Sequence, residues 1–80
     1  MRRTRQITAR AIEATDEALV IILPRRRFRI PWKDCSPKLA RATVEQRREG
    51  RLSPGGYGIQ WPALDEDLSI AGLVEHRAAR

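Results

Sequence analysis

The segment ALVIILPRRRFRIPW at residues 18–32 contains two hydrophobic patterns joined at a proline. Residues 19–23 form a continuous run of aliphatic, largely β-branched side chains, which is typical of a strand covered on both faces. Pro24 ends this run, and the chain then alternates with a period of two, which predicts a second, half-buried strand. One face would carry Arg26, Phe28, Ile30 and Trp32, and the opposite, solvent-facing one would carry Arg25, Arg27, Arg29 and Pro31.

A further strand is predicted upstream of this segment. Residues 7–14 alternate weakly between their two faces, and the polar triplet at residues 15–17 indicates a turn. Because both connections are short, we expect the three strands to form an antiparallel meander.

After residue 35 the pattern changes from strand to helix. Ser36 is a predicted N-cap, with Pro37 at the first helical position, and Thr43 with Gln46 has the spacing of a capping box. The sequence therefore predicts two short helices that meet at Thr43, or one kinked helix, ending near Gly50.

The last third of the chain predicts one more strand and one more helix. The turn-forming sequence PGG precedes a short hydrophobic strand at residues 57–61, which Pro62 ends. An apolar face at helical spacing then indicates a helix that begins at Asp67 or Ser69. The residues of this face are Ile70, Leu73 and Val74.

These elements predict an α+β fold. We expect one small antiparallel sheet, in the order β-β-β-α-β-α, with helices packed on one side. Eighty residues suffice for one domain with one small core and are too few for a Rossmann pair or a barrel. The single domain would span residues 1–80, with residues 1–6 as a flexible basic tail.

The positive charge is concentrated in the first part of the chain. The formal net charge is +6, and fourteen of the 16 cations are arginines. Residues 1–33 contain nine cations and three anions, whereas residues 34–80 contain seven of each. A one-sided basic surface attracts a polyanion or an acidic protein, although an ordinary solvated face has the same composition. The candidate contacts to a partner protein or nucleic acid are Arg2, Arg3, Arg5, Arg25, Arg27 and Arg29.

Nothing in the sequence predicts a membrane segment or a disulfide. The longest apolar run, residues 18–23, is far shorter than the roughly 20 residues that span a bilayer, and no stretch of signal-peptide length follows the basic start. The single Cys35 suits a reducing compartment. We therefore expect a soluble, cytoplasmic protein.

Candidate catalytic and metal-binding groups are few. The acidic triplet at residues 65–67 could hold a divalent cation, but no second acidic or histidine cluster completes such a site. The favoured interpretation is that these carboxylates stabilise the start of the last helix. Cys35 and His76 each lack a partner at nucleophile–base or metal-ligand spacing. We therefore expect no enzymatic activity, no metal and no cofactor.

The four aromatic side chains allow two interpretations. Aromatic rings interleaved with arginines are typical of sheets that stack nucleic-acid bases. In so short a chain they are also nearly the only large core material, and the core interpretation is favoured. These side chains are Phe28, Trp32, Tyr57 and Trp61.

Two motifs resemble a known family. The stretch GIQWPALDEDLS at residues 58–69, with PKLARAT and EQR at residues 37–47, resembles the motifs GI-x-WP-x-LDED-[IL]-S and PRL-x-x-AT-x-x-QR of bacterial domain-of-unknown-function family 2442. The resemblance covers nearly the whole chain, but LPRRR at residues 23–27 replaces the family's usual Asp-Gly-Arg hairpin. The motif residues to which we assign structural roles are Trp61, Pro62, Asp65, Asp67 and Ser69.

The resemblance implies a small, non-enzymatic protein, often encoded beside a small partner in an arrangement like a toxin–antitoxin pair. The leading hypothesis is thus an antitoxin-like protein that binds and neutralises a partner protein encoded by an adjacent gene. The alternatives are a nucleic-acid-binding regulatory module whose arginines contact phosphates and a small phage-type inhibitor.

Overall fold

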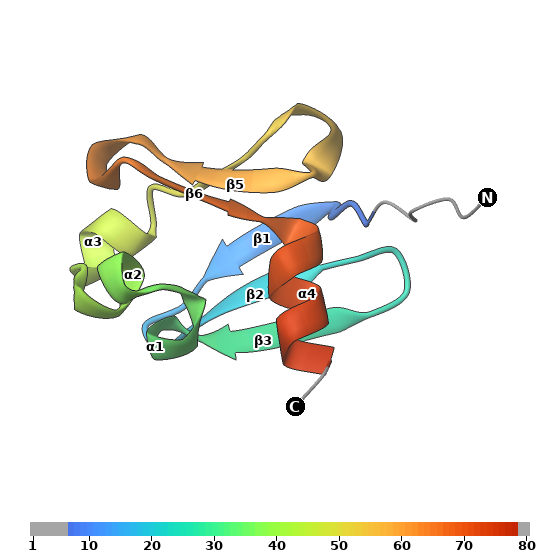
Figure 1. Ribbon diagram of the computed structural model, residues 1–80, viewed down its shortest axis with the longest axis horizontal. Coiled ribbons are helices and arrows are strands. Elements are labelled where there is room, and N and C mark those ends of the chain that lie inside the picture. Colours follow the sequence, from blue (N-terminus) through green and yellow to red (C-terminus); the bar gives the residue numbers. More distant parts are fainter. Residues whose placement is uncertain (1–6, 79–80) are drawn as a thin grey trace.

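The computed structural model describes residues 7–78, which form two three-stranded antiparallel sheets with short helices between and after them (Figure 1). In chain order the elements are β1 (Ala11–Ala14), β2 (Ala18–Ile22), β3 (Arg27–Pro31), α1 (Trp32–Cys35), α2 (Pro37–Arg41), α3 (Val44–Arg47), β4 (Arg51–Leu52), β5 (Gly58–Trp61), β6 (Glu66–Ser69) and α4 (Ile70–Ala78), with single 3-10 turns η1 (Pro54–Gly56) and η2 (Pro62–Leu64). The predicted α+β class is confirmed, with two small sheets where one was expected.

The first sheet is the predicted meander, in the order β1-β2-β3. Its inner face pairs Leu19 with Ile30 and Ile21 with Phe28, and all four side chains are buried. The period-two alternation of β3 is therefore confirmed. The prediction that β2 is covered on both faces is wrong, because Val20 and Ile22 point to the other side and are only half-buried.

The second sheet, in the order β4-β5-β6, corrects the interpretation of the acidic triplet. After β5, the η2 turn and Asp65, which has a left-handed backbone (φ 53°), reverse the chain. Residues 66–67 then belong to β6 and pair with β5, so the carboxylates lie in a hairpin and do not start a helix. The last helix instead begins after Ser69, whose Oγ accepts a hydrogen bond from the Gly72 N–H at 2.9 Å.

The helical connection between the sheets has the predicted caps. Ser36 Oγ accepts from the Leu39 N–H at 3.2 Å. Thr43 Oγ1 accepts from the Gln46 N–H, and Gln46 Oε1 accepts from the Thr43 N–H, both at 3.0 Å. Two short helices, α2 and α3, therefore meet at Thr43. The preceding turn α1 was not predicted: the alternation of β3 stops at Pro31, and Trp32 enters a helical turn.

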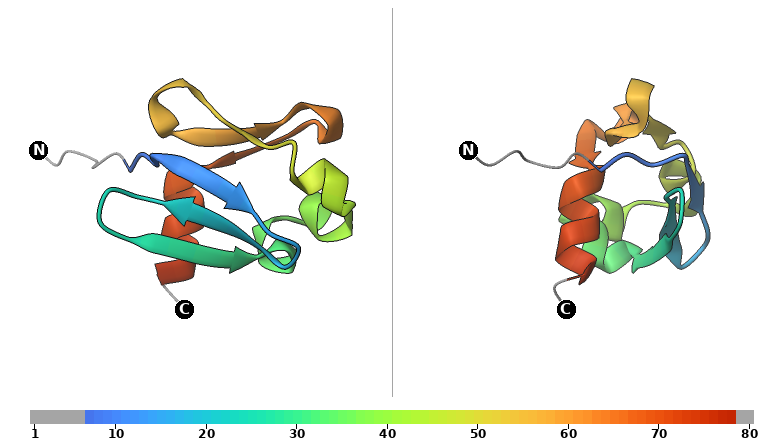
Figure 2. Two further views of the ribbon diagram at one scale, coloured as in Figure 1. Left: turned by 180° about the vertical axis from the view of Figure 1, so that it is seen from behind. Right: turned by 90° about the vertical axis from the view of Figure 1, so that its right-hand side faces the viewer.

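The core lies between the two sheets and α4, on one side of the first sheet (Figure 2). The Trp32 and Trp61 rings meet edge to face at its centre, with centroids 6.4 Å apart. Trp61 Nε1 donates to the Arg47 carbonyl at 3.1 Å. A Cβ on Gly50 would lie 2.5 Å from Trp61 Nε1, so only glycine allows this close approach. The core side chains of α4 are the predicted Ile70, Leu73 and Val74.

Arg47 links α2 to this core. Its Nε donates to the Leu39 carbonyl at 2.9 Å and its Nη2 to the Ala40 carbonyl at 3.0 Å, which satisfies two acceptors near the end of α2. The guanidinium also lies 5.4 Å from the centroid of the Trp32 ring. Arg47 is half-buried, and its guanidinium stabilises the fold through these contacts.

Candidate interaction surface

The outer face of the first sheet has no described element packed against it (Figure 2). The strand register sets two rows of side chains across this face. One row contains Ala11, Ile22 and Arg27, and the next contains Glu13, Val20 and Arg29. This surface, which we name the outer sheet face, therefore has a half-buried aliphatic centre with exposed arginines beside it.

One of these arginines is held by a weak surface ion pair. Arg29 Nη2 lies 3.1 Å from Glu17 Oε1, and the two side chains are 57% and 81% exposed. Exposed pairs of this kind contribute about 0–1 kcal/mol. A carboxylate on a partner could therefore compete for Arg29 at little cost.

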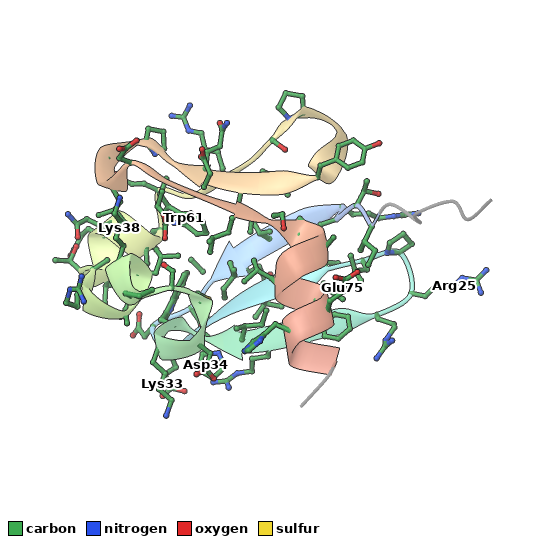
Figure 3. The ribbon with its side chains drawn as sticks, viewed as in Figure 1. Arg25, Lys33, Asp34, Lys38, Trp61 and Glu75 are labelled. Atoms are coloured by element: carbon green, nitrogen blue, oxygen red, sulfur yellow. The ribbon has the colours of Figure 1, made fainter. Side chains whose placement is uncertain are left out.

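The β2–β3 hairpin carries the other arginines of the predicted row. The Leu23 N–H donates to the Arg26 carbonyl at 2.8 Å, so Pro24 and Arg25 form a two-residue loop. Figure 3 shows Arg25 pointing away from the body of the protein at the end of this hairpin. The side chains at residues 25–27 line an open hollow of about 380 Å³ at the hairpin end.

The structure thus distributes the predicted arginines over two neighbouring places. Arg27 and Arg29 lie on the outer sheet face, and Arg25 lies at the end of the hairpin; all three are exposed, as the alternation predicted. The remaining candidates, Arg2, Arg3 and Arg5, lie outside the described residues.

The aromatic side chains do not form a stacking platform. Phe28, Trp32 and Trp61 are buried, which confirms the core interpretation for these three. Tyr57 is 50% exposed, so the core interpretation is wrong for it, because it precedes β5 at the η1 turn. Over residues 7–76, no large aromatic ring lies on the outer sheet face.

The family motif residues lie in the second sheet and in the turn between β5 and β6. Trp61 anchors the core, Pro62 begins η2, and Asp67 is exposed in β6 opposite Gln60. Lys38, which sequence reasoning missed, donates from Nζ to the carbonyls of Leu64 and Asp65 at 3.0 and 2.8 Å (Figure 3). The position of Lys38 in the family motif at residues 37–47 could have indicated a structural role. Its partners could not be identified from the sequence, because they lie 26 and 27 residues further along the chain.

Cys35 and His76, which the sequence left apart, line one open hollow of about 310 Å³ together with Asp34. Burial, with a smaller contribution from Asp34 and opposed by Arg47, raises the pKa of the Cys35 thiol to about 12. The thiol is thus protonated at neutral pH, which disfavours a role as nucleophile. No cluster of three or more metal-ligating side chains is found where the chain is described.

We expect Cys35 to resist alkylation at pH 8 in the folded protein and to react readily in urea. The native thiol keeps a proton that the unfolded chain releases above the ordinary thiol pKa of 9.0. Its contribution to stability is therefore constant below pH 9 and is lost as the pH rises toward 12. Alkylation time courses and urea midpoints at pH 8 and 10.5 measure both effects. A Cys35→Ala control removes this component of the pH dependence; fast native labelling at pH 8 would contradict the prediction.

Between residues 7 and 78 no helix is both long and apolar enough to cross a bilayer.

Comparisons with known proteins place the chain among proteins whose activity is not established. The sequence profile of a family described as protein of unknown function (DUF2442) matches residues 9–79. A search of curated proteins finds no match.

Two solved structures are similar to the chain. A protein of unknown function from Rhodospirillum rubrum has a TM-score of 0.78 at 24% identity, over 90% of this chain and 89% of that one, and this likeness shows the fold alone. An uncharacterized protein from Chromobacterium violaceum has a TM-score of 0.69 at 34% identity, over 88% of this chain and 66% of that one.

Proposed function

The chain belongs to the DUF2442 family of proteins of unknown function, and from this premise we propose that it is a non-enzymatic binding protein that docks a partner protein on its outer sheet face. Since family membership brings no activity with it, the proposal depends on the surface itself.

The observation that carries the proposal is the uncovered aliphatic centre of the first sheet. Val20 and Ile22 are half-buried within their own sheet, and no described element covers them. Arg27 and Arg29 lie beside them in the same cross-strand rows. An apolar centre with arginines at its border is the composition of many protein interfaces.

The charge of the chain favours an acidic partner. The net charge is +6, and the excess comes from residues 1–33, which include the whole first sheet. A partner with an apolar patch bordered by carboxylates complements both the aliphatic centre and the arginines, and electrostatic attraction speeds its association.

The outer sheet face suits a protein better than a nucleic acid. Glu13 lies in the same row as Arg29, and Glu17 is paired with that arginine. Both carboxylates would repel phosphates, and no aromatic ring on this face offers stacking to unpaired bases.

The finer proposal is an antitoxin-like role in a two-gene bacterial module, in which this protein neutralises a partner encoded by the adjacent gene in the cytoplasm. The motifs at residues 37–47 and 58–69 support this role through the gene arrangement that the family resemblance implies. A phage-type inhibitor would use the same surface on another target.

Co-expression with the adjacent gene tests the role. We expect this chain to restore the growth of cells that express the neighbour and to co-purify with it as a stable complex. A harmless neighbour, or one that never co-purifies, would contradict the antitoxin-like role.

A charge placed in the aliphatic centre tests the surface. Val20→Asp should weaken the complex by roughly 10- to 100-fold, because an unpaired carboxylate would be buried in the interface. Ala63→Asp, an exposed position in η2, is the matched control and should bind like the parent chain. Thermal melts establish that both variants are folded. Unchanged affinity of a folded Val20→Asp variant would exclude the outer sheet face.

A further inference from the structure

The end of the β2–β3 hairpin is a second basic feature, which adjoins the outer sheet face and shares Ile22 and Arg27 with it. Three consecutive arginines at residues 25–27 line the open hollow of about 380 Å³ with residues 22–24. All three arginines are exposed, and none of the residues that line the hollow is acidic.

The charges at the hairpin end are not neutralised within the described chain. The two ion pairs found in residues 7–76 join Arg29 to Glu17 and Arg48 to Asp16. Neither pair includes one of the three arginines of the hairpin end, residues 25–27. The hairpin end therefore presents net positive charge to solvent, whereas the exposed arginines of these two pairs have carboxylates beside them.

The hairpin end is also held in shape before any ligand arrives. The Arg26 guanidinium lies 4.7 Å from the centroid of the Phe28 ring, which anchors the middle arginine by a cation–π contact. Pro24 has a fixed φ, and the hydrogen bond from Leu23 to Arg26 closes the loop. Less conformational freedom is then lost on binding than a flexible arginine tail would lose.

The chemistry of this site is that of phosphate recognition. Each guanidinium offers a planar fork that binds phosphate oxygens in bidentate fashion. The Phe28 ring is 8% exposed, so it offers no platform on which unpaired bases could stack. Two-stranded β-ribbons are among the elements with which proteins contact duplex DNA.

We propose that the β2–β3 hairpin end binds the phosphate backbone of a nucleic-acid duplex through the arginines at residues 25–27, independently of base sequence. This activity goes beyond docking of a protein partner, and the two neighbouring sites differ in that Val20 lies only on the outer sheet face and Arg25 only at the hairpin end. Substitutions at Val20 and at Arg25 therefore test the two sites separately.

Salt-dependent titration of the full chain is the test, with a 20-base-pair DNA duplex, the same duplex in RNA, a dT20 single strand and a polyglutamate peptide as probes. The slope of log K against log salt counts the phosphates contacted, at about 0.9 for each on a duplex. The double variant Arg25→Gln/Arg27→Gln should lower the slope by about 1.8. The ratio of the duplex affinity at 50 mM salt to that at 200 mM salt should therefore be roughly 12-fold smaller for this variant than for the parent chain.

The matched control is Arg41→Gln/Arg48→Gln, which removes the same charge from two exposed arginines that lie outside the first sheet. This control should keep the slope of the parent chain. Duplex binding with the predicted difference between the two variants supports the proposal, and the DNA and RNA arms show which duplex is preferred. Equal slopes for the two variants, tighter binding of dT20 than of either duplex, or binding of polyglutamate alone would overturn it.

Discussion

Replacement of Trp61 by alanine is expected to leave the protein largely unfolded at 25 °C. The side chain is 1% exposed and is the largest one fully buried in the core. Truncation of a buried tryptophan costs about 3–5 kcal/mol, and the loss of its Nε1–H leaves the Arg47 carbonyl without that donor. A single core in a domain of about this length rarely supplies more than about 3–5 kcal/mol of net stability, so the loss is as large as the whole. Far-UV circular dichroism and urea titration would measure the loss.

Tyr57→Ala is the control for this experiment. Tyr57 is 50% exposed, so its truncation should change the unfolding free energy by less than about 1 kcal/mol. A cooperative, near-parental melt of the Trp61→Ala variant would contradict the prediction and would show that the ring at the centre of the family motif contributes little to stability.

The local signals in the sequence predicted the first sheet and the helical connection. Ser36 and Thr43 cap their helices as the spacing of their side chains requires, because a cap depends on atoms within three residues. The alternation at Phe28 and Ile30 likewise predicted which face of β3 is buried. These features depend on short stretches of chain, so they could be predicted from local sequence patterns.

The β5–β6 hairpin could not be predicted in the same way. Three acidic residues before an apolar periodic segment have the composition of a helix start, yet residues 66–69 pair with β5. The left-handed Asp65 and the Lys38 bonds to the turn carbonyls maintain this reversal. Contacts between residues 26 and 27 positions apart therefore override the local preference for a helix start. No pattern within a short stretch of sequence indicates such contacts.

The candidate surface was predictable only in part. The alternation predicted that Arg27 and Arg29 are exposed, and the structure agrees. That Val20 is uncovered depends on where α4 and the second sheet pack, because the run at residues 19–23 has the composition of a strand buried on both faces. The neutralisation of Arg29 by Glu17 depends on a turn twelve residues away. The exposure of these arginines was thus predictable from the sequence. The ion pair between Arg29 and Glu17 was not, because it depends on the folded arrangement of the two residues.

Gly56→Ala is expected to destabilise the protein by about 3 kcal/mol or more. Gly56 has a φ of +80°, and a Cβ at this position would lie 2.3 Å from the Ala9 carbonyl oxygen. A left-handed backbone costs a non-glycine residue about 1–2 kcal/mol. The clash is with backbone, so it would also break the hydrogen bond from the Ala9 N–H to the Gly56 carbonyl, 2.8 Å long, which ties the segment before β1 to η1. Urea midpoints would measure the change.

The adjacent glycine provides the control, because it has the same backbone strain without the backbone clash. Gly55 has a φ of +85°, but a Cβ there would contact only the Tyr57 ring, a half-exposed side chain that can rotate away. Gly55→Ala should therefore lower the free energy of unfolding only by the cost of a left-handed backbone at a non-glycine residue, about 1–2 kcal/mol. The difference between the two variants isolates the contact between Ala9 and η1. Equal destabilisation would mean that strain alone acts at Gly56, and that the Ala9 backbone moves aside without loss.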